Sequence, residues 1–312
     1  MKAVERIVVV TRRTRLEELL LRFNTRGQAR FYLERNGAEY ADYEREHDHY
    51  QQGLDRIRRA VDLGLPRQFI ERGLAPSYLF QPTDLVVTLG QDGLVANVAK
   101  YATGIPIVAV NPDPARFDGV LLPFGIAEAD AVLALAVAGE APVRRVTLAE
   151  ALLADGQRLL AFNDLFIGAR SHVSARYRLD VGGQSELQSS SGILVSTGAG
   201  STGWMSSVFN MAAGVAAFTG GRGGPPVRLD WEDDRLLYAV REPFQSRQSG
   251  VSLVAGLLDG GQPLRVESRM PAGGVIFSDG MESDCLPFDA GAIVEIRAAA
   301  RHAHLVTRAE AA

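Results

Sequence analysis

The sequence predicts an α/β domain followed by a β domain: a Rossmann-like parallel α/β domain over residues 1–156 and a β-sandwich domain over residues 157–312. Three observations lead to this prediction. The chain has 312 residues, enough for roughly two domains. In its first half, apolar strands alternate with helical patterns, which indicates a parallel sheet covered on both faces. Beyond about residue 157, short strands follow at near-regular spacing between Gly and Ser turns, which is typical of a sandwich.

The first domain begins with a β-branched strand at 7–10. The Thr14–Glu17 segment then has the pattern of a capping box at a helix N-terminus. Apolar residues at helical spacing predict a second helix over 42–63. The remaining elements predicted for this domain are, in order, a strand at 84–89, helix 94–103, strand 105–110 and alanine-rich helices at 126–138 and 148–153.

The second domain is read as a series of strands with one helix among them, at about 202–214. The strands are rich in β-branched and aromatic residues and are bounded by Gly and Ser turns. They are predicted at 158–167, 175–181, 192–196, 235–241, 264–268 and 274–277.

Composition narrows the class of protein. Apolar residues make up 46% and charged residues 22%, an ordinary globular balance, and the net charge of −4 argues against nucleic acid as a partner. No run of about 18 apolar residues predicts a membrane span. Residues 1–13 read as a strand and not as a signal peptide. The single cysteine, Cys285, cannot form an internal disulfide, so we expect a reducing, cytoplasmic location and interpret the thiol as a small apolar filler.

The most informative motif is the turn Gly90-Gln91-Asp92-Gly93, directly after the apolar strand at 84–89. Ligands of open α/β sheets bind at the carboxyl ends of the strands. Glycines in such a turn can adopt a positive φ and let backbone N–H groups approach phosphate oxygens. Asp92 could accept a proton from a hydroxyl or contact Mg²⁺. A tight turn in which Asp92 only caps the next helix is the alternative.

Two further motifs lie in the second domain. Asn163-Asp164 could hydrogen-bond a ribose diol or a base edge, or could be an ordinary turn pair. The segment from Ser196 to Trp204 is a Gly/Ser/Thr-rich turn entering a helix, where free N–H groups and hydroxyls suit an anion or a sugar. Trp204 could stack on a nicotinamide or adenine ring. A well-capped helix with a core tryptophan is the alternative.

Asp279-Gly280 is a fourth motif, with a hairpin turn as its default reading. Arginines at 241 and 247 and the Arg12-Arg13 pair could face phosphate or lie in solvent. The sequence lacks a P-loop, a Gly-x-Ser-x-Gly elbow and the dinucleotide fingerprint Gly-x-Gly-x-x-Gly at the first helix.

Taken in order, the four motifs resemble those of the NAD kinase family, which is related more distantly to diacylglycerol kinases and phosphofructokinases. The resemblance covers residues 84–297. The stretches 110–116 and 190–192 look most like the mitochondrial-type branch. The resemblance implies an N-terminal α/β domain, a C-terminal β-sandwich, and a kinase that transfers a phosphoryl group from ATP, or polyphosphate in some members, to the 2′-hydroxyl of the adenosine ribose of NAD.

The resemblance also implies roles for individual residues. Asp92 would orient or deprotonate the hydroxyl, and Mg²⁺ would bridge the ATP phosphates without a dedicated set of protein ligands. Self-association as a homodimer or homotetramer is implied as well. The residues implied to hold the nucleotides are Gly90, Gln91 and Gly93 for the donor phosphates, and Asn111, Asn163, Asp164, Thr202, Gly203, Trp204, Ser207 and Asp279 for the dinucleotide.

Three positions depart from the family pattern. Gln91 replaces a glycine, Leu94 a threonine, and Ser191 an aspartate that contacts the dinucleotide in bacterial members. If position 91 needs a positive φ, glutamine there costs on the order of 1 kcal/mol. Ser191 implies altered recognition at the nicotinamide end. The alternatives are therefore a kinase of a lipid, sugar or nucleoside hydroxyl, or a non-catalytic nucleotide-binding protein. The sequence leaves open the phosphoryl donor and the choice between NAD and NADH.

Overall fold

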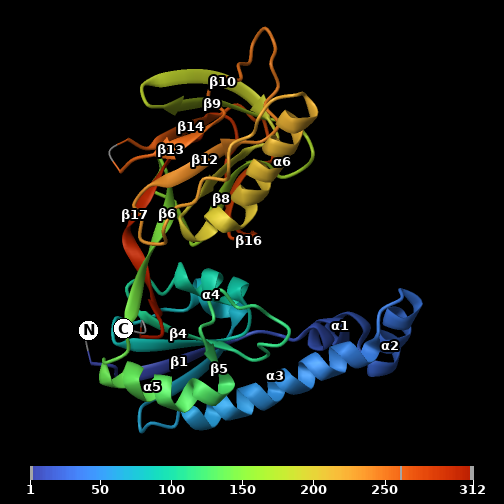
Figure 1. Cartoon of the computed structure of the whole chain (residues 1–312), viewed down its shortest axis with the longest axis vertical. Coiled ribbons are helices and arrows are strands. Elements are labelled where there is room, and N and C mark those ends of the chain that lie inside the picture. The colour runs from blue at the N-terminus through green and yellow to red at the C-terminus, as the bar shows by residue number, and fades with distance from the viewer. Residues whose placement is uncertain (1–2, 261, 310–312) are drawn as a thin grey trace. The chain divides into compact units, whose positions relative to one another are not determined.

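The computed structural model describes residues 3–260 and 262–309. The chain forms two compact units (Figure 1): unit 1 comprises Met1–Arg144 with His304–Ala312, and unit 2 comprises Arg145–Ala303. Unit 1 holds a parallel sheet with helices, and unit 2 holds antiparallel sheets. The predicted class, α/β followed by a β-sandwich, is confirmed.

The sheet of unit 1 has the strand order β2–β1–β3–β4, and all of its pairs are parallel. β3 and β4 are buried along their whole length, as strands covered on both faces must be. β5 and the last residues of β17 also pair with β4. The strands are β1 (Arg6–Thr11), β2 (Arg67–Glu71), β3 (Asp84–Leu89), β4 (Pro106–Asn111), β5 (Phe124–Gly125) and β17 (Ile293–Val306).

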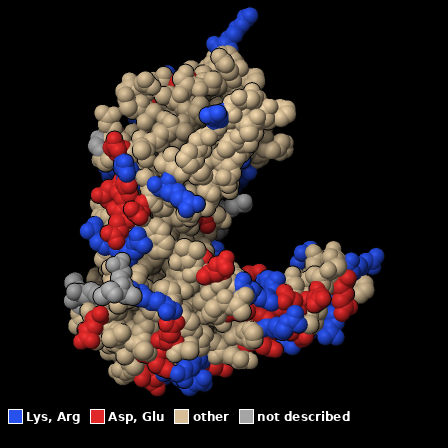
Figure 2. All heavy atoms as spheres, in the orientation of Figure 1, with Lys and Arg blue, Asp and Glu red and all other residues tan. Residues whose placement is uncertain are grey.

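The helices of unit 1 begin with the predicted capping box, in which Thr14 and Glu17 exchange hydrogen bonds. A helix that the sequence analysis missed, α2, follows, because only Ala29 and Leu33 of its residues are buried. Figure 2 shows basic and acidic side chains mixed over α1, α2 and α3. The helices are α1 (Arg15–Phe23), α2 (Arg26–Arg35), α3 (Tyr40–Ala60), α4 (Asp92–Ala99) and α5 (Ala129–Ala138), with 3-10 turns η1 (Arg72–Ser77) and η2 (Ile126–Glu128).

Unit 2 is a sandwich of antiparallel sheets. One sheet has the order β13–β12–β11–β8–β15–β16, and the other contains β10–β9–β14–β17 together with β6 and β7. Apolar side chains from both sheets form one core. The strands are β6 (Val143–Leu153), β7 (Arg158–Ala161), β8 (Asp164–Ala169), β9 (Ala175–Val181), β10 (Gln184–Ser190), β11 (Ile193–Ser196), β12 (Leu236–Val240), β13 (Ala255–Leu258), β14 (Leu264–Ser268), β15 (Gly274–Ser278) and β16 (Met281–Pro287).

The six-stranded sheet has one face in the core and one face outside it. Leu165 and Ile167 of β8 belong to the core. Because side chains alternate along a strand, Asp164, Phe166 and Arg170 lie on the opposite side, which we call the outer face. The helix α6 (Trp204–Phe218) covers part of the outer face (Figure 1), where Met205 packs against apolar residues of β11 and β12.

The predicted helix at 148–153 is wrong, because these residues belong to strand β6. Ala149 and Ala151 face the sandwich core and pair with β7. Glu150 lies between them and forms ion pairs with Arg158 and Arg297. Pairing and burial therefore override the helix propensity of Ala and Leu.

Candidate functional site

The turn Gly90–Gly93 lies at the carboxyl end of β3, as predicted. Gly90 donates its N–H to the carbonyl of Val110, at 3.2 Å, so the turn lies beside the end of β4. Asp92 is the first residue of α4. The first N–H groups of a helix have no partner within it, and the helix dipole favours an anion there. This end of the sheet therefore has the local chemistry of a phosphate site.

The expected backbone strain in this turn is absent. Neither Gly90 nor Gly93 has a positive φ, and Gln91 is extended, with φ −111° and ψ 167°. Space at Gly90 is limited instead: a Cβ there would lie 2.9 Å from Cδ2 of Leu94 and 3.4 Å from Cδ of Arg12, so the Leu94 side chain would have to shift. A Cβ at Gly93 would meet nothing within 4 Å. Gln91 therefore costs no conformational energy here.

Replacing Gln91 with glycine should be tolerated. The extended backbone gains no relief, and the greater freedom of glycine in the unfolded chain should lower the free energy of unfolding by under about 1 kcal/mol. If the glutamine side chain only narrows the approach to the turn, the turnover of the variant should equal or exceed that of the wild type. Urea unfolding and steady-state kinetics measure the two effects. A complete loss of turnover in a folded variant would show that Gln91 has a positive role.

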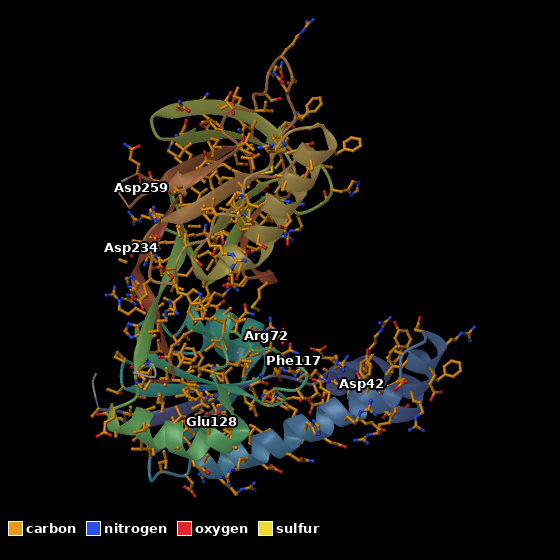
Figure 3. All side chains as sticks on the ribbon, in the orientation of Figure 1. Asp42, Arg72, Phe117, Glu128, Asp234 and Asp259 are labelled. Carbon is orange, nitrogen blue, oxygen red and sulfur yellow. The ribbon has the colours of Figure 1, made fainter. Side chains whose placement is uncertain are left out.

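Asp92 and Asn111 both hold the loop that follows β4. Oδ1 of the half-buried Asp92 accepts the N–H of Leu121 at 2.7 Å. Asn111 is buried; its Nδ2 donates to the carbonyl of Phe117 (labelled in Figure 3) at 3.0 Å, and its Oδ1 accepts the N–H of Asp113 at 3.0 Å. The loop is thus fixed beside the turn, and one oxygen of the Asp92 carboxylate is held by backbone.

Arg12 and Arg13, whose roles the sequence left open, point to different surroundings. Arg12 is only 11% exposed, donates to the buried Glu46 at 2.8 Å and lies against Gly90. Its Nε is buried and has no hydrogen-bond partner. Although burial opposes it, hydrogen bonds from two arginines hold the pKa of Glu46 below its usual value. Arg13 is about half exposed and pairs with Glu71. Arg12 is therefore the cation beside the turn.

In unit 2, Asp279 organises the connection between β7 and β8. Its carboxylate accepts backbone N–H groups of Phe162 at 3.0 Å, Asn163 at 2.7 Å and Asp164 at 3.4 Å. Its own φ is 53°, a left-handed conformation that aspartate tolerates better than most residues. Burial, and secondly the negative charge of Asp279, raise the pKa of Asp164 to about 7. Asp164 therefore binds a proton more tightly than an ordinary aspartate does.

The Gly/Ser/Thr-rich segment packs against the same connection. Thr197 donates its N–H to the carbonyl of Asn163 at 2.9 Å, and its Oγ1 accepts the N–H of Gly200 at 3.1 Å. A Cβ on Gly200 would lie 2.0 Å from that carbonyl oxygen of Asn163. Three predicted motifs, Asn163-Asp164, the segment containing Thr197, and Asp279, therefore meet at one end of the outer face.

Substituting Gly200 with alanine should destabilise unit 2, because no backbone shift can relieve a 2.0 Å approach without breaking these hydrogen bonds. We expect a loss of about 1–3 kcal/mol in the free energy of unfolding. Gly214 is a matched control: it lies in α6, and a Cβ there meets nothing within 4 Å. Alanine at 214 should be neutral or stabilise by about 0.5–1 kcal/mol. Equal effects in urea unfolding of the two variants would contradict the close packing.

The predicted residues at the start of α6 differ in exposure. Thr202, Gly203 and Ser207 are exposed, whereas Trp204 is half-buried. The Trp204 ring stacks on Phe166, with ring centroids 5.7 Å apart and an interplanar angle of 13°. The half-buried tryptophan therefore packs against the apolar cluster around Met205 and also belongs to an aromatic cluster on the outer face.

Phe166 and Phe277, which the sequence analysis did not single out, complete this cluster. Their ring centroids are 4.9 Å apart. A Cβ on Gly168 or Gly192 would lie 2.5 or 2.6 Å from the Phe166 ring, so these glycines let the ring lie flat on the sheet. The alternation Asp-x-Phe-x-Gly from residue 164 was the signal available in the sequence.

A cavity of about 420 Å³ opens above the cluster, within unit 2. Phe166, Trp204 and Phe277 form its aromatic wall. The other contributors include Arg170, His172, Ser191, Arg241 and Cys285. Such a concave, partly apolar space with a few polar groups is a default binding site for a small molecule.

No protein-family model matches this chain, and no curated protein sequence matches it. Solved structures do. An NAD kinase from Archaeoglobus fulgidus in complex with ATP matches with a TM-score of 0.58 and 18% identity, over 97% of this chain and 93% of that chain. The chain has the fold of the NAD kinases. Yeast NADH kinase complexed with NADH matches with a TM-score of 0.56 and 16% identity, over 99% of this chain and 85% of that chain.

Two further observations bear on what this NAD kinase fold can hold. Among the described residues, no helix is both long and apolar enough to span a membrane. Nor does that part of the chain contain three or more His, Cys, Asp or Glu residues grouped so that they could hold a metal ion.

Proposed function

We propose that the protein is a kinase that transfers a phosphoryl group from ATP to the 2′-hydroxyl of the adenosine ribose of NAD(H), giving NADP(H). The observation that carries the proposal is the meeting of Asn163-Asp164, Thr197 and Asp279 at one end of the outer face of unit 2. The fold shared with an NAD kinase in complex with ATP and with yeast NADH kinase complexed with NADH supports it.

The acceptor side of the proposal rests on the chemistry of unit 2. Asn163 has an amide that both donates and accepts, and Asp164 has a carboxyl group that does the same when protonated, so together they suit a ribose diol. The exposed Thr202, Gly203 and Ser207 offer hydroxyl and N–H groups at the start of α6. The aromatic wall offers stacking for a base.

The donor side rests on the chemistry of unit 1. The N–H groups at the start of α4 and the Arg12 guanidinium would neutralise phosphate oxygens, and Asp92 would accept the proton of the attacking hydroxyl. Mg²⁺ prefers oxygen ligands and often takes one or two carboxylates plus substrate phosphates. That preference fits the described residues, where Asp92 is the carboxylate at the turn, and the ion would supply charge neutralisation on the phosphates.

The direct test is incubation of the purified protein with ATP, Mg²⁺ and either NAD or NADH, with chromatographic detection of NADP or NADPH. A 2′-phosphate on the adenosine ribose, located by NMR, is the expected product. Phosphorylation of a lipid, sugar or nucleoside alcohol without NADP(H) would overturn the acceptor, and nucleotide binding without turnover would favour a binding protein. Polyphosphate in place of ATP tests the donor.

We expect a homodimer or homotetramer, which sedimentation would measure, and a cytoplasmic location consistent with the single cysteine.

A further inference from the structure

One face of the long helix α3 contacts the two segments of unit 1 that surround Asp92. The first segment is the turn Gly90–Gly93, and the second is the loop after β4, residues 112–121, which we call the 112–121 loop. Figure 3 labels Asp42 of the helix and Phe117 of this loop. The residues of the helix face, which lie three or four positions apart and therefore on one side of α3, are Asp42, Glu46 and His49.

Glu46 connects this face to the turn through Arg12. Its carboxylate is almost fully buried; Oε1 accepts a hydrogen bond from Nη2 of Arg12 at 2.8 Å, and Oε2 accepts one from Nε of Arg15 at 3.0 Å. A Cβ at Gly90 would lie 3.5 Å from Nε of Arg12. The buried carboxylate therefore ties α3 to the arginine that lies beside the turn.

Asp42 connects the same face to the 112–121 loop through Arg116. The guanidinium of Arg116 donates a hydrogen bond from Nη2 to Oδ1 of Asp42. Nε of Arg116 lies 3.7 Å from the Asp113 carboxylate, and Nδ1 of His49 lies 3.5 Å from that same carboxylate. Two side chains of α3 therefore engage the first half of the loop.

The second half of the loop contacts Asp92. Arg116 precedes Leu121 by five residues, and Leu121 donates its N–H to Oδ1 of Asp92 at 2.7 Å. Between them, the carbonyl of Phe117 accepts a hydrogen bond from Nδ2 of the buried Asn111 at 3.0 Å. Because this connection is short and held to the end of β4, a displacement of Arg116 would also displace the N–H that orients Asp92.

The ion pair between Asp42 and Arg116 is partly shielded from water, since the two side chains are 37% and 26% exposed. Hydrogen bonds from Arg116, and secondly from Arg15, hold the pKa of Asp42 below its usual value, so Asp42 is ionised at neutral pH. A hydrogen bond between two charged groups is stronger than one between neutral groups. The pair can therefore hold the loop in one place.

We propose that Asp42 and Arg116 are positioning residues for Asp92. The inference rests on the proposed function, in which Asp92 accepts the proton of the acceptor hydroxyl. A general base must lie within hydrogen-bond reach of that proton, and a small misplacement lowers the rate. The ion pair fixes the 112–121 loop against α3, and Leu121 then holds one oxygen of Asp92 and leaves the other for the hydroxyl. Neither Asp42 nor Arg116 needs to touch a substrate.

The kinetic test compares Arg116→Gln, Asp42→Asn and the double variant with the wild type. Each single variant should lose roughly three- to tenfold in kcat, the scale of one partly exposed charged hydrogen bond, while KM for ATP and for the dinucleotide stays unchanged. The double variant should lose no more than Arg116→Gln, because both changes break the same ion pair. Arg116→Lys keeps the charge and should recover most of the loss.

Arg45→Gln is the matched control. Arg45 donates to the same Asp42 carboxylate, at 3.3 Å, but it lies on α3 itself and makes no connection to the loop. Its kcat should therefore equal that of the wild type.

Hydrogen exchange of the Leu121 amide gives a second readout, which does not depend on turnover. In Arg116→Gln and Asp42→Asn this amide should exchange roughly three- to tenfold faster than in the wild type, because the loop opens more often. In Arg45→Gln it should exchange at the wild-type rate. If the wild type phosphorylates neither NAD nor NADH, the proposed function fails, and the exchange rate still decides whether the ion pair holds the loop on Asp92.

Three outcomes would overturn the inference. The first is a wild-type kcat and a wild-type Leu121 exchange rate in Arg116→Gln. The second is a raised KM with an unchanged kcat, which would place Arg116 in contact with a substrate. The third is a double variant whose loss is the product of the single losses, which would show that the two residues act independently. If Arg116→Gln does not fold, Asp42→Asn breaks the same pair, and Glu46 still ties α3 to its neighbours.

Discussion

Replacement of Asp92 with asparagine should lower kcat by roughly 10²–10⁴-fold, the range for loss of a general base. The fold should persist, because the amide oxygen of asparagine can still accept the N–H of Leu121 that Oδ1 accepts at 2.7 Å. Only the ability to take a proton from the acceptor hydroxyl, and the negative charge at the start of α4, are removed. Steady-state kinetics of NADP(H) formation and urea unfolding of the same preparation measure the two parts.

The matched control is Asp130→Asn in α5, where the carboxylate is about half exposed and pairs with Arg56 on the surface. An exposed pair of this kind contributes about 0–1 kcal/mol. Asp130→Asn should therefore keep the kcat of the wild type. Wild-type turnover in a folded Asp92→Asn protein would rule out the role proposed for Asp92.

The free energy of unfolding should depend on pH through Asp164. Its pKa is raised from about 3.8 to about 7, so the native state holds this proton more tightly than the unfolded chain. The contribution of the Asp164 proton to the free energy of unfolding is fully present below about pH 4. It decreases as the pH rises from about 4 to about 7 and is absent above that. A pKa difference of about three units between the folded and the unfolded chain corresponds to about 4 kcal/mol of stabilisation at most.

Asp164→Asn removes this titration. The variant should therefore gain about 3–4 kcal/mol relative to the wild type between pH 4 and pH 8, measured as the difference between their free energies of unfolding in urea. Asp279→Asn provides a second check, because it removes the neighbouring negative charge but keeps an acceptor for the N–H of Asn163. The pH range over which stability falls should therefore move to lower pH. Parallel pH curves for Asp164→Asn and the wild type would exclude the titration.

The fold class was predictable because the core strands carry strong local patterns. β3 and β9 begin and end at the predicted residues, since one is a continuous apolar run and the other alternates. β6 was not predictable in this way, because Ala149 and Ala151 owe their strand conformation to pairing with Ala161 and Leu159 of the neighbouring strand β7. The short or weakly apolar elements α2, β2 and β13 likewise depend on tertiary packing.

The candidate site was predictable to the level of motifs and not of contacts. Asp92, Asn163 and Asp164 stand at strand ends, which the sequence pattern identifies. The turn glycines were interpreted through a positive φ, whereas the structure shows Gly90 with an ordinary φ and with Leu94 and Arg12 close to it. That closeness depends on strands that pair in space, so no local signal separates Arg12 from Arg13.

The residues of the aromatic wall were harder still to predict. Phe166 and Phe277 read as ordinary strand residues, because aromatic side chains in a sandwich strand are most often part of the core. Only the register of β8 against β11 and β15 puts both on the outer face. Arg241 joins them for the same reason, at the end of β12.

The alternation of side chains along β8 makes the outer face of its sheet intolerant of insertions. Inserting or deleting one residue between Asp164 and Arg170 would turn every following side chain over, burying polar groups and bringing Leu165 or Ile167 into the solvent. Length variation in relatives should therefore fall in the turn after Arg170 and not within the strand. Side chains on the outer face and in the core can be substituted independently, but an insertion or deletion in β8 alters both faces at once.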